Sequence, residues 1–248
     1  YNTHGGLYGS LGSWYEWVPP SVHFRQPYFE LWQPFVDYVS RLSAVLSQGR
    51  HVADVALLYP LTSIHANWIG GDRFTAEAVE VNVTTLALAR NIFTAGIDFD
   101  FINDDKLCEA DFTGGKLRVA GMEFGMVLLP PLTTIRLATL EKLRDYVRAG
   151  GAVMGFRRLP TASTEVGRGD GQVRRLLTEI FGFASSAEYV FTAERNRHSG
   201  ISMSVLEHEG GGRGIFVPEH EIHRTRYYDP GFERPACSVH EIISNQIR

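Results

Sequence analysis

Apolar residues in the first quarter of the chain recur at steps of three and four. The stripe consists of Tyr28, Leu31, Trp32, Phe35, Val36, Val39, Leu42, Val45 and Leu46. On a helix of 3.6 residues per turn these positions share one face, so the spacing predicts a long helix that lies against a large surface. Pro27 suits the position before a helix, and Gly49 suits its left-handed end. Pro34 either kinks the helix or marks its true first turn.

An apolar run at 52–60 follows this helix after only a few residues and is predicted to be a strand that ends at Pro60. The helix is thus predicted to be the last element of one structural unit, and the strand the first element of the next. We therefore place a domain seam here, with one domain at 1–50 and a second at 51–248.

Strands and helices alternate through most of the second domain. After a predicted loop at 61–74, the pattern predicts helices at 75–95, 137–148 and 171–181 and strands at 97–102, 116–119, 126–129 and 152–155. Continuous apolar strands between helices are typical of a parallel sheet covered on both faces, so the fold class is α/β, doubly wound. Beyond Tyr189 the segments 201–206 and 214–217 are predicted to be peripheral, partly antiparallel strands.

Composition excludes several function classes. The net charge is −4 without a long basic run, which argues against nucleic-acid binding. The sequence has no apolar stretch of the roughly 20 residues that a membrane span needs. Cys108 and Cys237 are either two free thiols or one disulfide, so the compartment, whether secreted, periplasmic or cytoplasmic, stays open.

The first seventeen residues are dense in glycine and aromatic side chains and are predicted to form an irregular loop. Tyr8, Trp14 and Trp17 lie there beside His4 and Glu16. Rings with polar edges next to such groups are typical of carbohydrate pockets, so His4, Tyr8, Trp14 and Trp17 are our candidate substrate-binding residues. The alternative interpretation is that these rings only fill space between packed elements.

Ligands of open α/β sheets bind beyond the carboxyl ends of the strands, here after Tyr59, Ile102, Leu129 and Gly155. A class I glutamine amidotransferase would need a nucleophile on a tight turn after the strand, but Phe156, Arg157 and Arg158 follow Gly155. The loop after Tyr59 has no glycine-rich phosphate turn.

No metal site is predicted. The segment 219–223 resembles a zinc motif, yet His220 and His223 are three residues apart instead of four. Glycoside hydrolysis needs two carboxyl groups about 5–9.5 Å apart across one sugar. Only Glu16 lies among candidate sugar-binding residues, so it is a candidate accessory carboxylate. If the chain belongs to a glycosidase, the principal catalytic pair is expected outside it.

The region around the seam carries a resemblance to a known family. The residues that carry it are His4–Ser10, Pro19–Ser21, Gln26–Pro27, Trp32, Tyr38, Arg41–Ser43, Leu46–Gly49, His51–Val55 and Tyr59–Pro60. This stretch resembles the end of the catalytic TIM barrel in large bacterial α-L-rhamnosidase-like glycoside hydrolases. The segment Ser13–Trp17 stands where many relatives have a basic run, which puts rhamnose specificity in question.

The resemblance implies that 1–50 contains the last barrel strand and helix. It implies that 51–248 is a flavodoxin-like domain similar to class I glutamine amidotransferases without the catalytic Cys, akin to the trimerisation domain of some β-galactosidases. It also implies a carbohydrate substrate, contact with the rest of the polypeptide or a homo-oligomer, and calcium as an accessory ion. The alternative is a non-catalytic interaction or assembly module.

Overall fold

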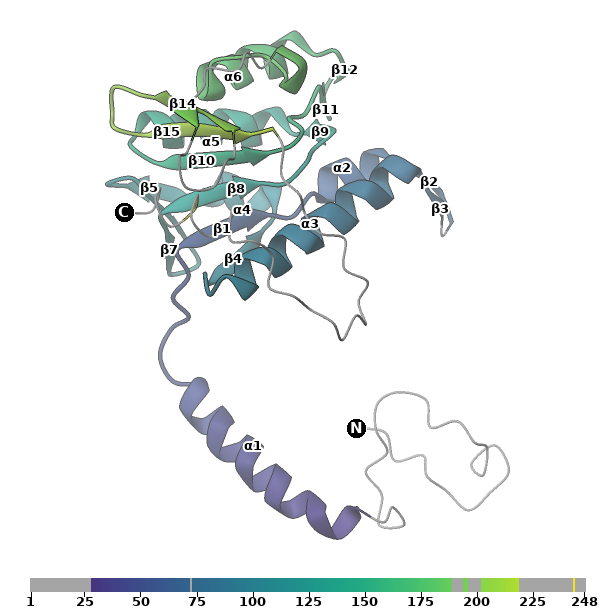
Figure 1. Cartoon of the computed structure of the whole chain (residues 1–248), viewed down its shortest axis with the longest axis vertical. Helices are drawn as coiled ribbons and strands as arrows, with labels where there is room; N and C mark the ends of the chain where they lie inside the picture. The colour runs from purple at the N-terminus through teal and green to yellow at the C-terminus, as the bar shows by residue number, and fades with distance from the viewer. Residues whose placement is uncertain (1–27, 72, 189–193, 196–201, 219–242, 244–248) are drawn as a thin grey trace. The chain divides into compact units, whose positions relative to one another are not determined.

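The computed structural model describes residues 28–71, 73–188, 194–195, 202–218 and 243, and the structural statements below concern these residues. The chain divides into two compact units, Tyr1–His51 and Val52–Arg248 (Figure 1). This division falls beside the seam placed from the sequence. The two units are described separately.

The described part of the first unit is a single helical segment. The short turn η2 (Phe29–Leu31) leads directly into α1 (Trp32–Leu46). Pro34 lies in the first turn of α1, where a backbone N–H has no helical partner, so Pro34 does not break the helix. Gly49 has φ +91°, the left-handed conformation predicted for it. Many large apolar side chains of this segment are exposed, among them Leu31, Phe35, Tyr38, Leu42, Val45 and Leu46.

The second unit is built on a seven-stranded sheet with the order β13-β14-β15-β10-β8-β1-β4. Its strands are β1 (Val55–Leu58), β4 (Phe99–Ile102), β8 (Met126–Leu129), β10 (Ala152–Phe156), β13 (Glu194–Arg195), β14 (Ser202–Glu207) and β15 (Arg213–Val217). The five strands from β4 to β15 are parallel, and β14 and β13 extend the sheet in antiparallel pairing. The sequence prediction of an α/β fold with a parallel sheet is therefore confirmed.

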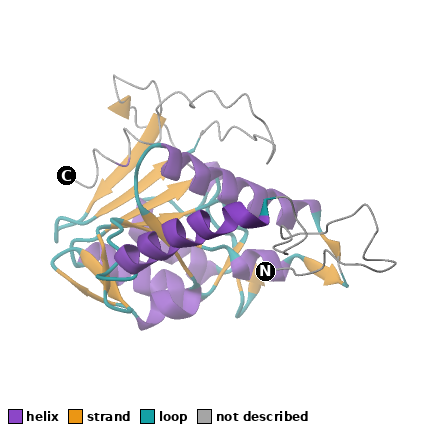
Figure 2. Ribbon diagram, turned by 90° about the horizontal axis from the view of Figure 1, so that it is seen from below, coloured by secondary structure: helices purple, strands orange, loops and turns teal. Residues whose placement is uncertain are grey.

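Helices cover both faces of this sheet, and all four residues of β1 are therefore buried. Val55 and Leu57 belong to a core cluster with the α3 residues Leu88 and Ile92, to which Ile243 also belongs. Alternate residues Ala56 and Leu58 pack in a second cluster with α4, α5 and α6. The covering helices are α3 (Ala76–Thr94), α4 (Asp104–Glu109), α5 (Leu137–Arg148) and α6 (Gly171–Phe181), and Figure 2 shows helices packed beside the strands.

The helix boundaries follow local signals that the sequence carries. Thr75 caps α3, with its Oγ1 accepting a hydrogen bond from the backbone N–H of Ala78 at 3.2 Å. Gly182 ends α6 with φ +87°. Within the described part of the chain, the search for a helix with the length and hydropathy of a membrane span finds none.

The predicted loop at 61–74 is wrong in detail. It contains α2 (Leu61–Ala66) and the hairpin of β2 (Trp68–Gly70) with β3 (Arg73–Phe74). Six residues are too short to show helical periodicity, and so short a helix depends on tertiary contacts. For α2 these are the hydrogen bonds of Ser63 to the loop after β8.

Two small sheets were also missed in whole or part. The strands β5 (Asp111–Thr113), β6 (Lys116–Val119) and β7 (Met122–Phe124) form one, of which only β6 was predicted. The strands β9 (Thr134–Ile135), β11 (Ala162–Ser163) and β12 (Gly167–Arg168) form the other. Strands of two or three residues carry too little alternation to be recognised from sequence. The remaining short element is the turn η3 (Ser186–Glu188).

One strand that was predicted to be peripheral is central. β15 pairs in parallel with β10 along its whole length, and its residues Gly214 to Val217 are buried. The antiparallel prediction is correct for β14, which pairs with the other side of β15. A run of four buried residues is typical of a central strand. The glycine-rich turn at 209–213, just before β15, suggested a peripheral hairpin instead.

Candidate functional site

A pocket of about 900 Å³ opens beyond the carboxyl ends of β1 and β8. From β1 the chain crosses to its neighbour β4, and then returns to β8 on the other side of β1. The order of strands reverses between these two strands, and open α/β sheets bind ligands at such a point. The lining residues are Thr62, His65, Ala66, Asn67, Glu77, Thr133, Thr134, Arg136, Thr161, Ala162, Ser163, Thr164, Gly167 and Arg168.

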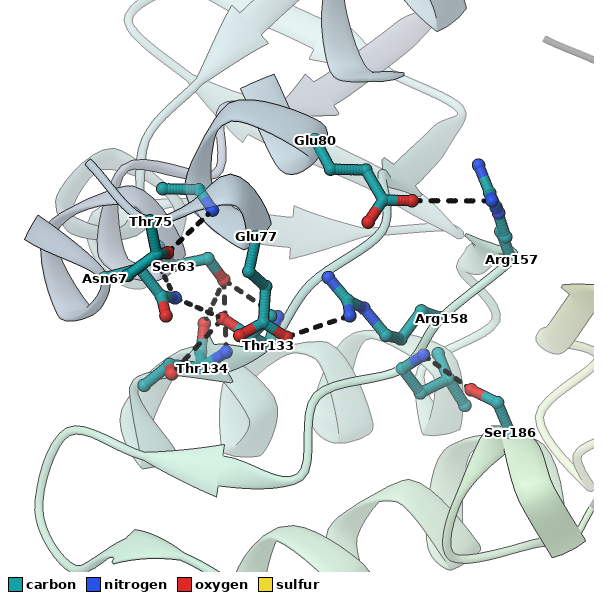
Figure 3. Close-up of polar contacts among 12 residues, drawn as sticks. Ser63, Asn67, Thr75, Glu77, Glu80, Thr133, Thr134, Arg157, Arg158 and Ser186 are labelled. Atoms are coloured by element: carbon teal, nitrogen blue, oxygen red, sulfur yellow. Dashed lines mark hydrogen bonds and ion pairs between the residues drawn. The ribbon is translucent and has the colours of Figure 1, made fainter. Parts of the chain in front are cut away.

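A hydrogen-bond network around Ser63 joins α2 to the loop after β8 (Figure 3). The fully buried Ser63 Oγ donates to the carbonyl of Thr134 at 2.7 Å and accepts from the N–H groups of Thr133 and Thr134, both at 3.1 Å. Asn67 Nδ2 donates to Ser63 O at 2.8 Å and to Thr133 Oγ1 at 3.1 Å. These hydrogen bonds hold one wall of the pocket in place, and none of them uses Asn67 Oδ1.

The small sheet β9-β11-β12 supplies the opposite side of the pocket. Thr134 lies opposite Ala162, and Ala162 lies opposite Arg168. Directly paired residues share a face of a sheet, so these three form one row. Behind the row, Ser163 Oγ donates to the buried Asp170 at 2.5 Å, and Asp170 also caps α6 by accepting from Gln172 N at 2.8 Å. The Ser163 hydrogen bond, followed by that of Gln172, lowers the pKa of the Asp170 carboxyl.

The turn after β10 approaches the pocket from a third direction and carries two ion pairs with α3. Arg158 Nη1 lies 3.0 Å from Glu77 Oε1, and Arg157 Nη2 lies 3.4 Å from Glu80 Oε1 (Figure 3). Arg157 has φ +59°. Enzymes with a nucleophile elbow place their nucleophile on such a strained turn after a strand, whereas here the residue is an arginine.

A buried carboxylate lies beside the pocket but is fully engaged. Asp104 accepts hydrogen bonds from Thr62 Oγ1 and Thr139 Oγ1, each at 2.6 Å. Its neighbour Asp105 lies 2.5 Å from Arg136 Nη1. This hydrogen bond raises the pKa of the Arg136 guanidinium, which therefore stays positively charged.

The described lining of the pocket contains few carboxylates. Glu77 is the one carboxylate among its lining residues, and it is paired with Arg158. Both hydrolytic mechanisms need two carboxyl groups across the same sugar. The described lining residues therefore do not include such a pair.

The structure does not test the candidate substrate-binding residues named from the sequence. His4, Tyr8, Trp14, Glu16 and Trp17 lie outside the described residues, as do Asp72, His220, His223 and Cys237. Asp37 is on α1 and accepts a hydrogen bond from Gln33 Nε2 at 2.8 Å. Cys108 is a free thiol, 3.8 Å from Thr139 Oγ1.

No set of three His, Cys, Asp or Glu side chains in the described ranges is placed to hold a metal ion. We assign no role to calcium among these residues. The pocket residues themselves were missed, although the loops after β1 and β8 were named as places to look. The remaining signal, the threonine-rich segments near 133 and 161–164, is too common in loops to be diagnostic.

Sequence comparison identifies the family. The profile of glycoside hydrolase family 106, described as alpha-L-rhamnosidase, matches residues 18–210. This match covers more than half of the chain and includes both units. The chain therefore belongs to this glycoside hydrolase family.

Individual relatives are more distant. A protein of Formosa agariphila named "Putative beta-glucuronidase" is 29% identical over 150 residues, which is 60% of this chain and 11% of that protein. Gan42B, a GH42 beta-galactosidase from G. stearothermophilus, has a TM-score of 0.54 with 15% identity, over 78% of this chain and 31% of its own. At this identity the likeness shows the fold alone. The chain thus spans less than a third of either protein.

Proposed function

We propose that this chain is part of a larger glycoside hydrolase and that its α/β unit is a non-catalytic domain of that enzyme. The family match supports a carbohydrate-active protein. The single observation that carries the non-catalytic role is the pocket with one carboxylate, Glu77, already paired with Arg158. The principal catalytic carboxylates would then lie outside this chain.

The finer fold assignment is part of the same proposal. Numbered along the chain, the five parallel strands follow the order 2-1-3-4-5, since β4-β1-β8-β10-β15 are neighbours. This is the order of flavodoxin-like folds. Together with Arg157 at the strained turn after β10, it supports a flavodoxin-like domain related to amidotransferases that has no nucleophile at this position.

The first unit is proposed to be the end of the catalytic barrel. Its helix α1 exposes a stripe that includes Leu31, Phe35 and Leu42. A contiguous apolar stripe of this kind indicates a surface that is normally covered. The barrel of the same polypeptide is the cover that the family resemblance suggests.

The substrate is proposed to be a plant or microbial polysaccharide. His4, Tyr8, Trp14 and Trp17 would contact the sugar, with Glu16 as an accessory carboxylate. The departure of 13–17 from the common family pattern and the name of the Formosa relative support testing glucuronides beside rhamnosides.

An assembly role is the second candidate. The outer face of α3 exposes Val79, Val83, Leu86 and Phe93, which follow helical spacing. Such a stripe suits contact with another domain or with a second copy of the chain. This role is compatible with membership of the enzyme family, because it concerns the α/β unit alone.

Hydrolysis of nitrophenyl α-L-rhamnoside and β-D-glucuronide tests the proposal. The 248-residue chain should show no turnover, whereas the full-length enzyme should hydrolyse at least one of the two substrates. Turnover by the 248-residue chain at its mass of 27.7 kDa would contradict the non-catalytic role. Inactivity of the full-length enzyme toward a broad panel of glycosides would contradict the glycosidase assignment.

A further inference from the structure

The pocket beyond β1 and β8 has no role in the hydrolytic function proposed above. Its volume of about 900 Å³ lies within the range of roughly 300–1,000 Å³ that is usual for small-molecule sites. Its lining departs from that of most such sites, because hydroxyl, amide and charged groups predominate over apolar ones. A polar, hydrogen-bonding ligand suits it better than an apolar one.

Several of these polar groups remain available to a ligand. The side chains of His65, Thr161, Thr164 and Arg168 line the pocket and make no hydrogen bond or ion pair with any other described residue. Asn67 uses its Nδ2 for Ser63 and Thr133, which leaves its Oδ1 as an acceptor. Donors and acceptors that converge from α2, β12 and the loops match the hydroxyl groups of a sugar.

The charges of the pocket favour an anion. Glu77 is neutralised by Arg158, and Arg136 is held by Asp105. Arg168 keeps a guanidinium without a carboxylate partner among the described residues. A guanidinium binds a carboxylate with two parallel hydrogen bonds, which makes this pair stronger than a contact between neutral groups.

The lining of the pocket places this charge beside a small side chain. Ala162, which also lines the pocket, lies between Thr134 and Arg168 in the row across the small sheet. No Phe, Tyr or Trp is among the described lining residues, so a neutral sugar would have no ring to stack on. Affinity therefore depends on hydrogen bonds and on charge.

We propose that this pocket binds a small carbohydrate that carries a carboxylate, with the carboxylate against Arg168 and the hydroxyls against Asn67, His65 and Thr164. That the ligand is a sugar rests on the proposed function, whereas its negative charge follows from the pocket itself. The proposal concerns binding alone, since Glu77 is the one carboxylate among the described lining residues. It would hold an acidic end or side branch of the polysaccharide while catalysis takes place elsewhere.

Calorimetric titration of the 248-residue chain tests the proposal. D-glucuronate and D-galacturonate are compared with neutral D-glucose and L-rhamnose, and with acetate and inorganic sulfate. At least one uronate should bind at least tenfold more tightly than the neutral sugars and than acetate or sulfate. If a neutral sugar binds as tightly as the uronates, the proposed role of the charge is wrong. If acetate or sulfate binds as tightly as the uronates, the proposal that the ligand is a sugar is wrong. Absence of uronate binding would overturn the proposal.

Arg168→Ala is the decisive variant because Arg168 is exposed and its loss leaves no buried group unpaired. It should weaken uronate binding at least tenfold, the loss expected for one charged hydrogen-bonded pair. Arg118→Ala is the matched control: Arg118 is also exposed, but lies on β6, away from the pocket lining. An equal effect of both variants, or no effect of Arg168→Ala, would contradict the site. Hydrolysis by the full-length enzyme is measured separately, so that failure of this site and failure of the glycosidase assignment are distinguishable.

Discussion

The two edges of the central sheet are constructed in different ways. At the amino edge, before β10 and β15, glycines bring backbones together: a methyl group on Gly212 would lie 1.8 Å from the carbonyl oxygen of Val147, and one on Gly210 would lie 2.2 Å from that of Arg148. At the carboxyl edge, side-chain hydrogen bonds such as those of Ser63 hold loops apart around a pocket. Backbone contact leaves no room for a ligand, whereas side-chain contact does.

Tyr146 shows how tightly the amino edge of the sheet is packed. Its hydroxyl donates to the carbonyl of Gly115 at 3.0 Å, and its ring is fully buried against Gly151. Burial raises the pKa of the Tyr146 hydroxyl to about 12. The comparison predicts that changes at the amino edge affect stability alone, while changes at the carboxyl edge affect stability less and binding more.

Gly212→Ala should have the largest effect. Because Val147 and Gly151 backbone oxygens lie 1.8 and 2.7 Å from the new methyl group, the turn before β15 must move. We expect a loss of about 3 kcal/mol or more in the free energy of unfolding, the upper range for overpacking. Urea unfolding measures it, with Gly171→Ala as control, since nothing lies within 4 Å of a methyl group there. Equal stability of both variants would show that the amino edge is not tightly packed.

Ser63→Ala should be the strongest single change at the carboxyl edge. It removes the partner of two N–H groups and one carbonyl, which costs about 1–3 kcal/mol when such groups stay buried. It should also weaken uronate binding, because α2 and the loop after β8 separate. Thr164→Ala, which removes a hydroxyl with no described partner, should leave the unfolding free energy unchanged. A stable Ser63→Ala protein with intact binding would contradict the role of this network.

Asp170→Asn should change stability only in a limited pH range. The lowered pKa of Asp170 means that its carboxylate stabilises the folded state above the unfolded pKa of about 3.9, and that this contribution is lost as the pH falls through the folded value. The variant should therefore be less stable than the native chain at pH 6, and this difference should shrink toward pH 3. Urea midpoints at both values measure it, with the exposed Asp98→Asn as control. A difference that grows on acidification would contradict the assignment.

The ion pair of Arg158 with Glu77 should have the smallest effect. Both side chains are partly exposed, so a double-mutant cycle should give a coupling of about 0.2–1 kcal/mol. The matched comparison is the ion pair of Arg118 with Glu123 in the β5-β6-β7 sheet, which has a distance of 2.8 Å and is more exposed. Its coupling energy should be about 0.2 kcal/mol or less. A coupling above about 2 kcal/mol for Arg158 with Glu77 would show that this wall of the pocket is more buried than described.

The sequence was sufficient to predict the elements whose signals are local. The continuous apolar runs at 126–129 and 152–155 and the helix boundaries near 75 and 181 all depend on near neighbours, and these predictions are confirmed. Helix α2 depends on contacts across 70 residues, such as Ser63 with Thr133, and the small sheet pairs Thr134 with Ala162; periodicity reveals neither. Hence the edge of the sheet that carries the pocket could be named in advance, but its residues could not.

Amide chemical-shift mapping during a D-glucuronate titration tests the contrast between the edges most directly. We expect the largest shifts at Asn67, Thr133, Thr164 and Arg168, which line the pocket. The amides of Gly115, Gly150 and Gly212 at the amino edge should not move. Shifts at the amino edge, or none at the pocket at saturating uronate, would contradict the account.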